Sequence, residues 1–189
     1  MSSLSMLEKH ASVLDLRMEV RLIGRSGEVP MLADEEHAAI VGSLAAWFRE
    51  AGFEVELEAS FNEFGERGRI DVLAYDPASR TLVIVEVKTL LVDHQDLLGA
   101  LSVRTRLAPT IARRRGWDVR RTVTVLAVAR TSLNRSAVSA HAALFEAFSV
   151  SRLGRTALAT HERMLVWVGP DRVARQRWIA GRQRVRRRG

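Results

Sequence analysis

The sequence predicts an α/β fold in which a mixed central sheet is flanked by helices. Residues 53–61 alternate between apolar and polar side chains, which is typical of a half-buried strand. Residues 82–85 read Leu-Val-Ile-Val without alternation, so we expect a central strand that is covered on both faces. Helical patterns stand before and after these strands, and together the three observations favour a layered α/β domain.

The first of these helices is expected over residues 34–51. Asp34 is a good N-cap, and Gly52 ends the pattern. Its apolar positions recur at helical spacing. They are Ile40, Val41, Leu44, Ala45, Trp47 and Phe48.

Three strands are expected next, over residues 53–61, 69–75 and 81–88. In the first strand the odd-numbered residues from Phe53 to Phe61 are expected to share one face. Residues 62–68 and 76–79 contain turn-forming residues, so the second and third strands should form a hairpin.

The second half of the domain continues the α/β pattern. A helix is expected over 93–108, where Pro109 ends or kinks it, and residues 111–117 are candidates for a further turn. A nearly all-apolar strand is expected over 119–129. A further helix over 132–148 carries His141 on its apolar side, and a short strand follows at 164–168.

The chain of 189 residues is expected to hold one main domain with two flanking segments. The domain is assigned to residues 34–170. Before it lies an N-terminal arm, residues 1–33, with a short helix at 1–16 and a strand at 17–24. After it comes an arginine-rich tail, residues 171–189.

Charge is distributed unevenly along the chain. Residues 1–100 contain 9 basic and 18 acidic residues, whereas residues 101–170 contain 12 and 3. This asymmetry suggests a polyanionic partner. The chain has no cysteine, which excludes disulfides, thiol nucleophiles and cysteine zinc sites. No apolar run is long enough to cross a bilayer, so we expect a soluble, cytoplasmic protein with no membrane partner.

The candidate chemistry lies in Asp71, Glu86 and Lys88. Glu86 and Lys88 are two apart on a strand, so they share a face. If four residues form the preceding loop and Asp76 opposes Thr81, Asp71 stands opposite Glu86. A loop of five residues would instead place these carboxylates on opposite faces. Two carboxylates so close repel each other unless a cation lies between them.

This arrangement favours Mg²⁺, with Mn²⁺ as a substitute. Magnesium is held by one or two carboxylates, keeps several waters, and takes phosphate oxygens as further ligands. The Val87 carbonyl, between Glu86 and Lys88, is a possible third protein ligand. Lys88 would orient or help deprotonate a water and stabilise developing charge. The alternative is a structural salt bridge among the three residues.

In this chain Asp71 is followed, after fourteen residues, by Glu86-Val87-Lys88. This pattern resembles that of the PD-(D/E)xK nuclease superfamily. Residues 34–148 are also similar to a nuclease-like domain of actinobacterial proteins, often attached to helix-turn-helix regulators. The segments that carry this similarity are Ser60-Phe61-Asn62, Gly65-Glu66-Arg67-Gly68, Val85-Glu86-Val87-Lys88-Thr89, Leu97-Leu98-Gly99, Arg106-Leu107-Ala108-Pro109 and His141-Ala142-Ala143-Leu144-Phe145. Two positions depart from the superfamily pattern: Ile70 replaces the proline before Asp71, and Gly99 replaces the tyrosine of exonuclease relatives.

The resemblance implies a restriction-endonuclease-like αβββαβ core and a metal-dependent nuclease. It assigns metal binding to Asp71 and Glu86 and catalysis to Lys88. The expected activity is hydrolysis of phosphodiester bonds in DNA by an endonuclease, with RNA as the alternative substrate and a homodimer as a candidate assembly. The alternative is a non-catalytic nucleic-acid-binding or regulatory module that retains the nuclease fold.

Further residues are candidates with ordinary structural alternatives. Glu58 could be an additional ligand or part of a solvated strand face, and Gln95 could reach the scissile phosphate or be a plain first-turn polar residue. Glu36 more simply suits a helix dipole. Six arginines are expected to contact nucleic acid, or else to form a solvated helix face. They are Arg67, Arg69, Arg104, Arg106, Arg113 and Arg114.

Overall fold

The computed structural model describes residues 28–169. The chain divides at Asp34 into two units, and the elements below belong to the second unit, apart from the first turns of α2. The helix at 1–16, the strand at 17–24 and the arginine-rich tail expected from the sequence lie outside the described residues. The elements are α2 Glu28–Glu50, β1 Glu54–Glu63, β2 Glu66–Asp76, β3 Thr81–Lys88, α3 His94–Arg113, β4 Arg121–Ala129, α4 Ser132–Ala140, α5 Ala142–Phe145, β5 Ser149–Val150, α6 Arg155–Thr160 and β6 Arg163–Val168.

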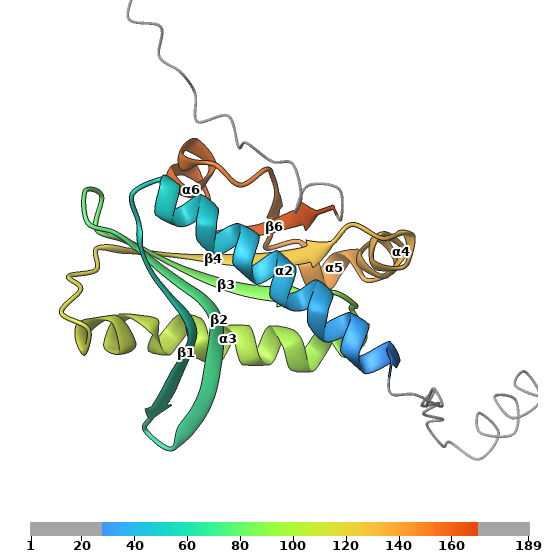
Figure 1. The fold of residues 1–189 in the computed structure, drawn as a ribbon, viewed down its shortest axis with the longest axis horizontal. Coiled ribbons are helices and arrows are strands. Elements are labelled where there is room, and N and C mark those ends of the chain that lie inside the picture. The colour runs from blue at the N-terminus through green and yellow to red at the C-terminus, as the bar shows by residue number, and fades with distance from the viewer. Residues whose placement is uncertain (1–27, 170–189) are drawn as a thin grey trace, which may run out of the picture. The chain divides into compact units, whose positions relative to one another are not determined.

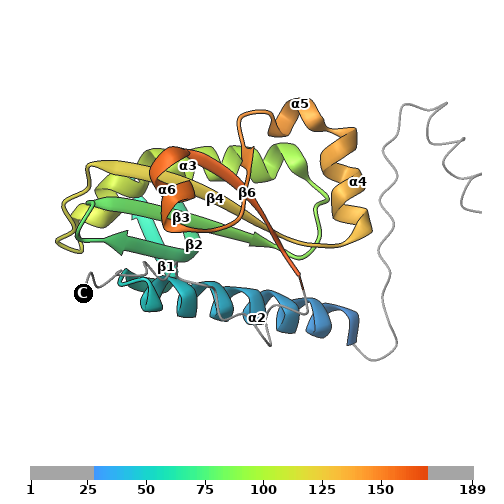
Figure 2. The same ribbon diagram turned by 90° about the horizontal axis from the view of Figure 1, so that it is seen from above.

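A six-stranded mixed sheet forms the centre of the second unit, in the order β1-β2-β3-β4-β6-β5. The first three strands are antiparallel, and β3, β4, β6 and β5 are mutually parallel. Helix α2 covers one face and α3 the other (Figures 1 and 2). The expected α/β class with a mixed, helix-flanked sheet is therefore confirmed.

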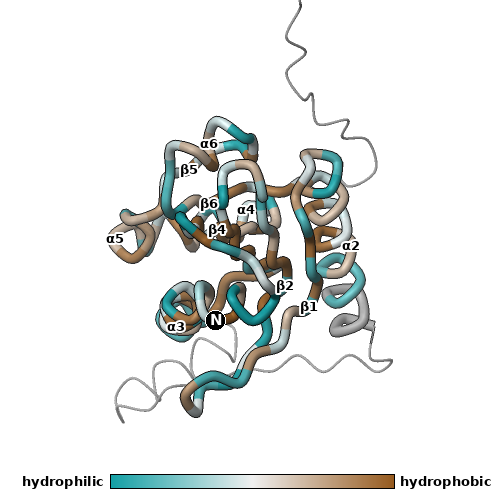
Figure 3. The backbone as a smooth tube through the Cα atoms, turned by 90° about the vertical axis from the view of Figure 1, so that its left-hand side faces the viewer, coloured by the Kyte–Doolittle hydropathy of each residue, from teal (hydrophilic) through white to brown (hydrophobic). Residues whose placement is uncertain are grey.

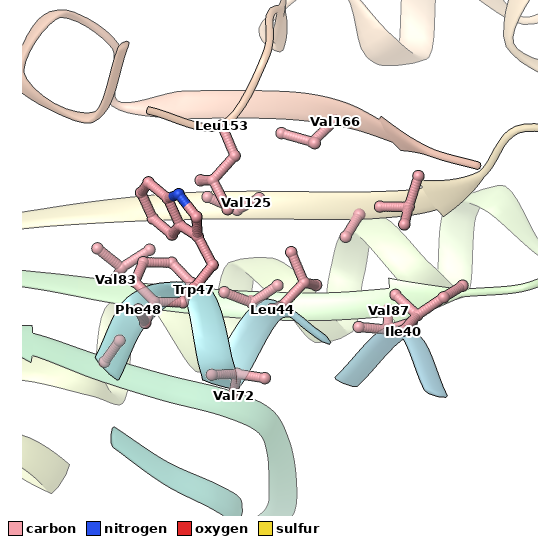
Figure 4. Close-up of a cluster of buried hydrophobic side chains, with 14 of the residues drawn as sticks. Ile40, Leu44, Trp47, Phe48, Val72, Val83, Val87, Val125, Leu153 and Val166 are labelled. Carbon is pink, nitrogen blue, oxygen red and sulfur yellow. The ribbon is translucent and has the colours of Figure 1, made fainter. Parts of the chain in front are cut away.

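Burial explains why β3 is central. Residues 81–87 are all buried, because odd-numbered valines pack under α2 while Leu82 and Ile84 pack under α3. Figure 3 shows hydrophobic segments concentrated in the strands between these helices. Figure 4 shows Ile40, Leu44 and Phe48 of α2 lying against the valines of the sheet. The predicted apolar stripe of the first helix is thus part of the core.

Three expected boundaries are wrong. Helix α2 begins at Glu28, so Asp34 lies inside it; Pro30 fits the first turn, where backbone N–H groups have no helical acceptor. Helix α3 continues through Pro109 to Arg113, because buried Ile111 and other side chains beyond the proline hold it on the sheet. The helix expected over 132–148 breaks at His141, which is exposed and leaves helical geometry with φ −116° and ψ 34°.

The expected alternation in β1 is also wrong at one residue. Val55 packs on the α2 side, but Ala59 and Phe61 pack on the α3 side. Glu58 has φ +51°, a left-handed conformation that interrupts the pleat. The residues on either side of Glu58 pair with β2, Leu57 with Val72 and Ala59 with Ile70. Glu58 and Asp71 therefore lie across from each other but do not form a pair of the ladder. Both strands change face at this point.

The turn expected over residues 62–68 is shorter in the structure. Strands β1 and β2 continue to Glu63 and Glu66, which pair, and only Phe64 and Gly65 connect them. No helix within residues 28–169 combines the length and apolar character required to cross a bilayer.

Candidate active site

The β2–β3 hairpin has the loop of four residues that places Asp71 level with Glu86. Asp76 pairs with Thr81, and the ladder runs to Val72 and Val85. The predicted loop of four residues is therefore confirmed, whereas Asp71 and Glu86 do not form a pair of the ladder. The ladder ends one step before Asp71, where β2 leaves β3. The Asp71 Oδ2 oxygen accepts the Val87 backbone N–H at 2.7 Å in place of a strand partner.

This hydrogen bond also orients the Val87 carbonyl. In an extended strand the N–H and C=O of one residue leave on the same side. Since the Val87 N–H points to Asp71, its carbonyl faces the same opening between β2 and β3. The opening therefore collects a carboxylate and a main-chain oxygen.

Glu86 lies on the α3 side of the opening and is 3% exposed. Its Oε1 is 3.0 Å from the Lys88 ammonium, and its Oε2 is 3.1 Å from Arg104 Nη1. The Arg104 contact lacks hydrogen-bond alignment, so within the described residues the buried Oε2 accepts no hydrogen bond. A buried carboxylate oxygen with a free acceptor position is costly unless a further cation or donor binds it.

Asp71 shares the electrostatic environment of Glu86 and Lys88. Burial, and then the nearby Glu86 charge, raise the pKa of Asp71 above its usual value; the Val87 N–H, His37 and Lys88 act in the opposite direction. The three predicted residues are therefore close enough to influence one another. Their excess of negative charge is of the kind that a divalent cation relieves.

Two more side chains lie beside Asp71. His37 of α2, Glu58 of β1 and Asp71 each offer a ligand atom, and these atoms lie within 4.8 Å of one another. His37 Nε2 is 3.9 Å from Asp71 Oδ1. Glu58 reaches this position through its left-handed backbone, although Arg69 also pairs with it at 2.9 Å.

Sequence reasoning identified Glu58 as a candidate but missed His37. The available signal was its helical spacing: His37 precedes Ile40 and Val41 by three and four residues, so it lies on the buried side of α2. Glu36, the acidic neighbour considered instead, does not belong to this cluster of ligand atoms among the described residues.

A cleft of about 360 Å³ opens beside Glu86 and Lys88. Arg104 and Leu97 of α3 line it, together with the loop that follows β3. Gln95 is exposed on the first turn of α3 and is not one of the residues that line this cleft. Glu86, Lys88 and Arg104 are therefore accessible from this cleft, whereas Asp71 is not one of the residues that line it.

Asn134 fixes the loop after Lys88. It is fully buried, accepts the Leu91 N–H at 2.9 Å, and donates to the Thr89 and Ala129 carbonyls at 2.9 and 2.8 Å. One side chain thus ties the end of β3 to the end of β4. Its hydrogen bonds limit the movement of the strand end that carries Lys88.

Four of the six arginines expected to contact nucleic acid form ion pairs within the domain. Arg104 pairs with Glu86, and the other three connect the β1–β2 hairpin internally or to α3. These pairs are Arg69 with Glu58, Arg106 with Glu66, and Arg114 with Glu63. Within the described residues, Arg67 and Arg113 are exposed and make no ion pair. Part of the charge asymmetry along the chain is therefore neutralised by folding.

Acidic residues of β1 are also paired within the domain. Arg115 forms a two-point hydrogen bond with Glu56, which lowers the pKa of Glu56. Trp117 Nε1 donates to Glu54 at 2.7 Å. These contacts join the acidic residues of β1 to the region after α3.

Comparison of the sequence with known proteins identifies no relative of this chain. No protein-family model matches the chain, and no curated protein matches it significantly.

Proposed function

We propose that the protein is a Mg²⁺-dependent endonuclease that hydrolyses phosphodiester bonds in DNA. The observation that carries the proposal is the juxtaposition of Asp71, the buried Glu86 and the Lys88 ammonium where β2 leaves β3. The order α2-β1-β2-β3-α3-β4 supports a restriction-endonuclease-like αβββαβ core. RNA as the alternative substrate, a homodimer and a cytoplasmic location belong to the same proposal.

The donor set fits a hard divalent cation. Asp71, Glu86 and the Val87 carbonyl would hold Mg²⁺ or Mn²⁺ through oxygen atoms, and Glu86 Oε2, which pairs with Arg104 but accepts no hydrogen bond among the described residues, is a suitable ligand atom. Glu58 is an auxiliary candidate. His37 adds a nitrogen donor, which suits Mn²⁺ or another transition metal better than Mg²⁺. A bound ion supplies charge neutralisation at the phosphate and acidifies a water.

The residues of the chain supply position and charge. Lys88, held by Glu86, presents its ammonium to the cleft, where it orients the attacking water and stabilises charge developing on the phosphate. Arg104 lines the same cleft and offers guanidinium N–H groups to phosphate oxygens. Water adds to phosphorus and the sugar oxygen leaves, so neither step requires an oxidant or a covalent enzyme intermediate.

A second candidate function is supported by the pairing of Glu86 with both Lys88 and Arg104. Two cations on one buried carboxylate also describe a structural network. In that case the protein is a nucleic-acid-binding or regulatory module that retains the fold without hydrolysis.

Incubation of the full chain with supercoiled plasmid distinguishes the two functions. We expect conversion to nicked circles in Mg²⁺ or Mn²⁺ and no conversion in EDTA. Retention of the plasmid with a steep salt dependence, but without nicking in either metal, would support the binding module and contradict the nuclease.

A further inference from the structure

The outer part of the β1–β2 hairpin, residues 58–71, forms an arm that leaves the sheet. Strand β3 pairs with β2 only over Val72–Asp76, so the arm is a two-stranded ribbon. Figures 1 and 3 both show it extending away from the other strands. The candidate active site lies at its base, because Glu58 and Asp71 mark the point where it departs.

The tip of the arm presents an aromatic side chain to solvent. Phe64 and Gly65 form a two-residue turn in which both φ angles are positive, +53° and +83°. Such turns favour asparagine and glycine, and the left-handed conformation is unfavourable for phenylalanine because its Cβ crowds the following carbonyl. Phe64 is nevertheless 83% exposed, which is the highest exposure of any large apolar side chain in the described part of the chain. Packing within the fold does not compensate for this conformation.

The arm is held in a fixed position. Its apolar side chains, Phe61 and Ile70 among them, pack on α3. The buried Glu63 pairs with Arg114 at 2.8 Å next to the tip. Close packing requires Gly68, since a Cβ there would lie 2.6 Å from the Phe61 ring. The tip is therefore presented at a constant distance from the site.

The positive charge near the tip and the distance from the tip to the candidate site indicate a phosphate-bearing partner. Arg67, three residues from Phe64, is exposed and without an ion pair among the described residues, and the paired Arg106 and Arg114 are still 62% and 67% exposed. The pair of Arg106 with Glu66, whose side chains are 62% and 48% exposed, is a surface pair and weak enough for phosphate to compete with it. Phe64 is about six residues from the base of the arm at Glu58, which at about 3.3 Å per residue is a distance of about 20 Å. At about 3.4 Å per nucleotide along one strand, this distance corresponds to about six nucleotides.

We propose that the arm is a nucleic-acid contact element in which Phe64 stacks on a base of a single-stranded segment about six nucleotides from the scissile phosphate. Arg67 contacts the backbone beside it. Aromatic stacking contributes about 1–3 kcal/mol per base and tolerates any base. The inference rests on the proposed function, because the site at the base of the arm fixes the position of the strand.

Binding of fluorescent single-stranded DNA, measured by anisotropy in EDTA, tests the arm without cleavage. We expect Phe64→Ala to weaken binding of a 24-mer by about 5- to 150-fold and to leave binding of a 4-mer, which is too short to reach from the site to the tip, nearly unchanged. Phe64→Trp should retain the affinity. Phe64→Ala should not alter the salt slope, whereas Arg67→Ala should reduce it by about 1. Leu133→Ala, on α4 and 69% exposed in the parent protein, is the matched control.

The outcomes separate the arm from the nuclease proposal. Equal affinity of Phe64→Ala and the parent for the 24-mer, with a preserved melting temperature, overturns the role of the arm and favours a protein partner at the tip. Length-dependent loss of binding in a protein that nicks no plasmid supports the arm and contradicts the nuclease. Absence of DNA binding by the parent protein contradicts both.

Discussion

Lys88→Arg is expected to abolish Mg²⁺-dependent plasmid nicking while the protein remains folded. Arginine keeps a positive charge beside Glu86, whose Oε1 lies 3.0 Å from the lysine ammonium. Its delocalised guanidinium does not reproduce a compact ammonium that holds or exchanges a proton with water. Loss of a positioned acid–base group lowers rates by about 10²- to 10⁴-fold. Initial nicking rates, with melting temperatures, measure this effect.

The control for Lys88→Arg is Arg120→Met. Arg120 is exposed at the opposite end of the sheet and contacts Arg80 through its backbone N–H. We expect its nicking rate to equal that of the parent protein. If Lys88→Arg nicks at the parent rate, Lys88 serves only as a charge partner of Glu86, and its catalytic role is wrong.

Asp71→Asn is expected to abolish nicking and, in metal-free buffer at neutral pH, to raise the melting temperature. Burial and the Glu86 charge raise the pKa of Asp71, so its ionised form destabilises the folded state. The folded protein then binds the proton more tightly than the unfolded chain, and stability falls as pH rises above the ordinary value of 3.8. Asparagine avoids this loss and still accepts the Val87 N–H. The difference from the parent should disappear below pH 3.8.

Asp76→Asn, at the other end of β2, is the matched control. The Asp76 carboxylate accepts Ser79 Oγ at 2.7 Å and the Ala78 N–H at 3.1 Å, and it pairs with Arg155 at 3.3 Å. The same substitution should therefore lower the melting temperature there while nicking persists below the transition. A lower neutral-pH melting temperature for Asp71→Asn would contradict the electrostatic description of the site.

Local rules were sufficient for the central part of the fold. The run Leu82–Val85 required a covered strand, and a loop of four residues determined the register of β2 and β3 as far as Val72 and Val85. Both follow from short-range geometry, in which side chains alternate and opposed residues keep a constant sum.

The remaining features depend on contacts that are distant in the sequence. Regular alternation cannot reveal that Glu58 adopts a left-handed conformation and turns Ala59 toward α3. Arg115 pairs with Glu56, which is 59 residues away in the sequence. The uneven distribution of charge, which suggested a polyanionic partner, therefore also reflects contacts within the chain. His37 becomes a candidate ligand only when α2 is placed over the sheet.

The most direct test of the central claim is the position of Mn²⁺ in crystals of the full chain, located by its anomalous scattering. The account predicts one peak within coordination distance of both the Asp71 and Glu86 carboxylates, with Arg104 displaced from Glu86. A peak held only by His37, Glu58 and Asp71, or no peak with Glu86 still paired to Lys88 and Arg104, would contradict the shared-ion site on which the proposed hydrolysis depends.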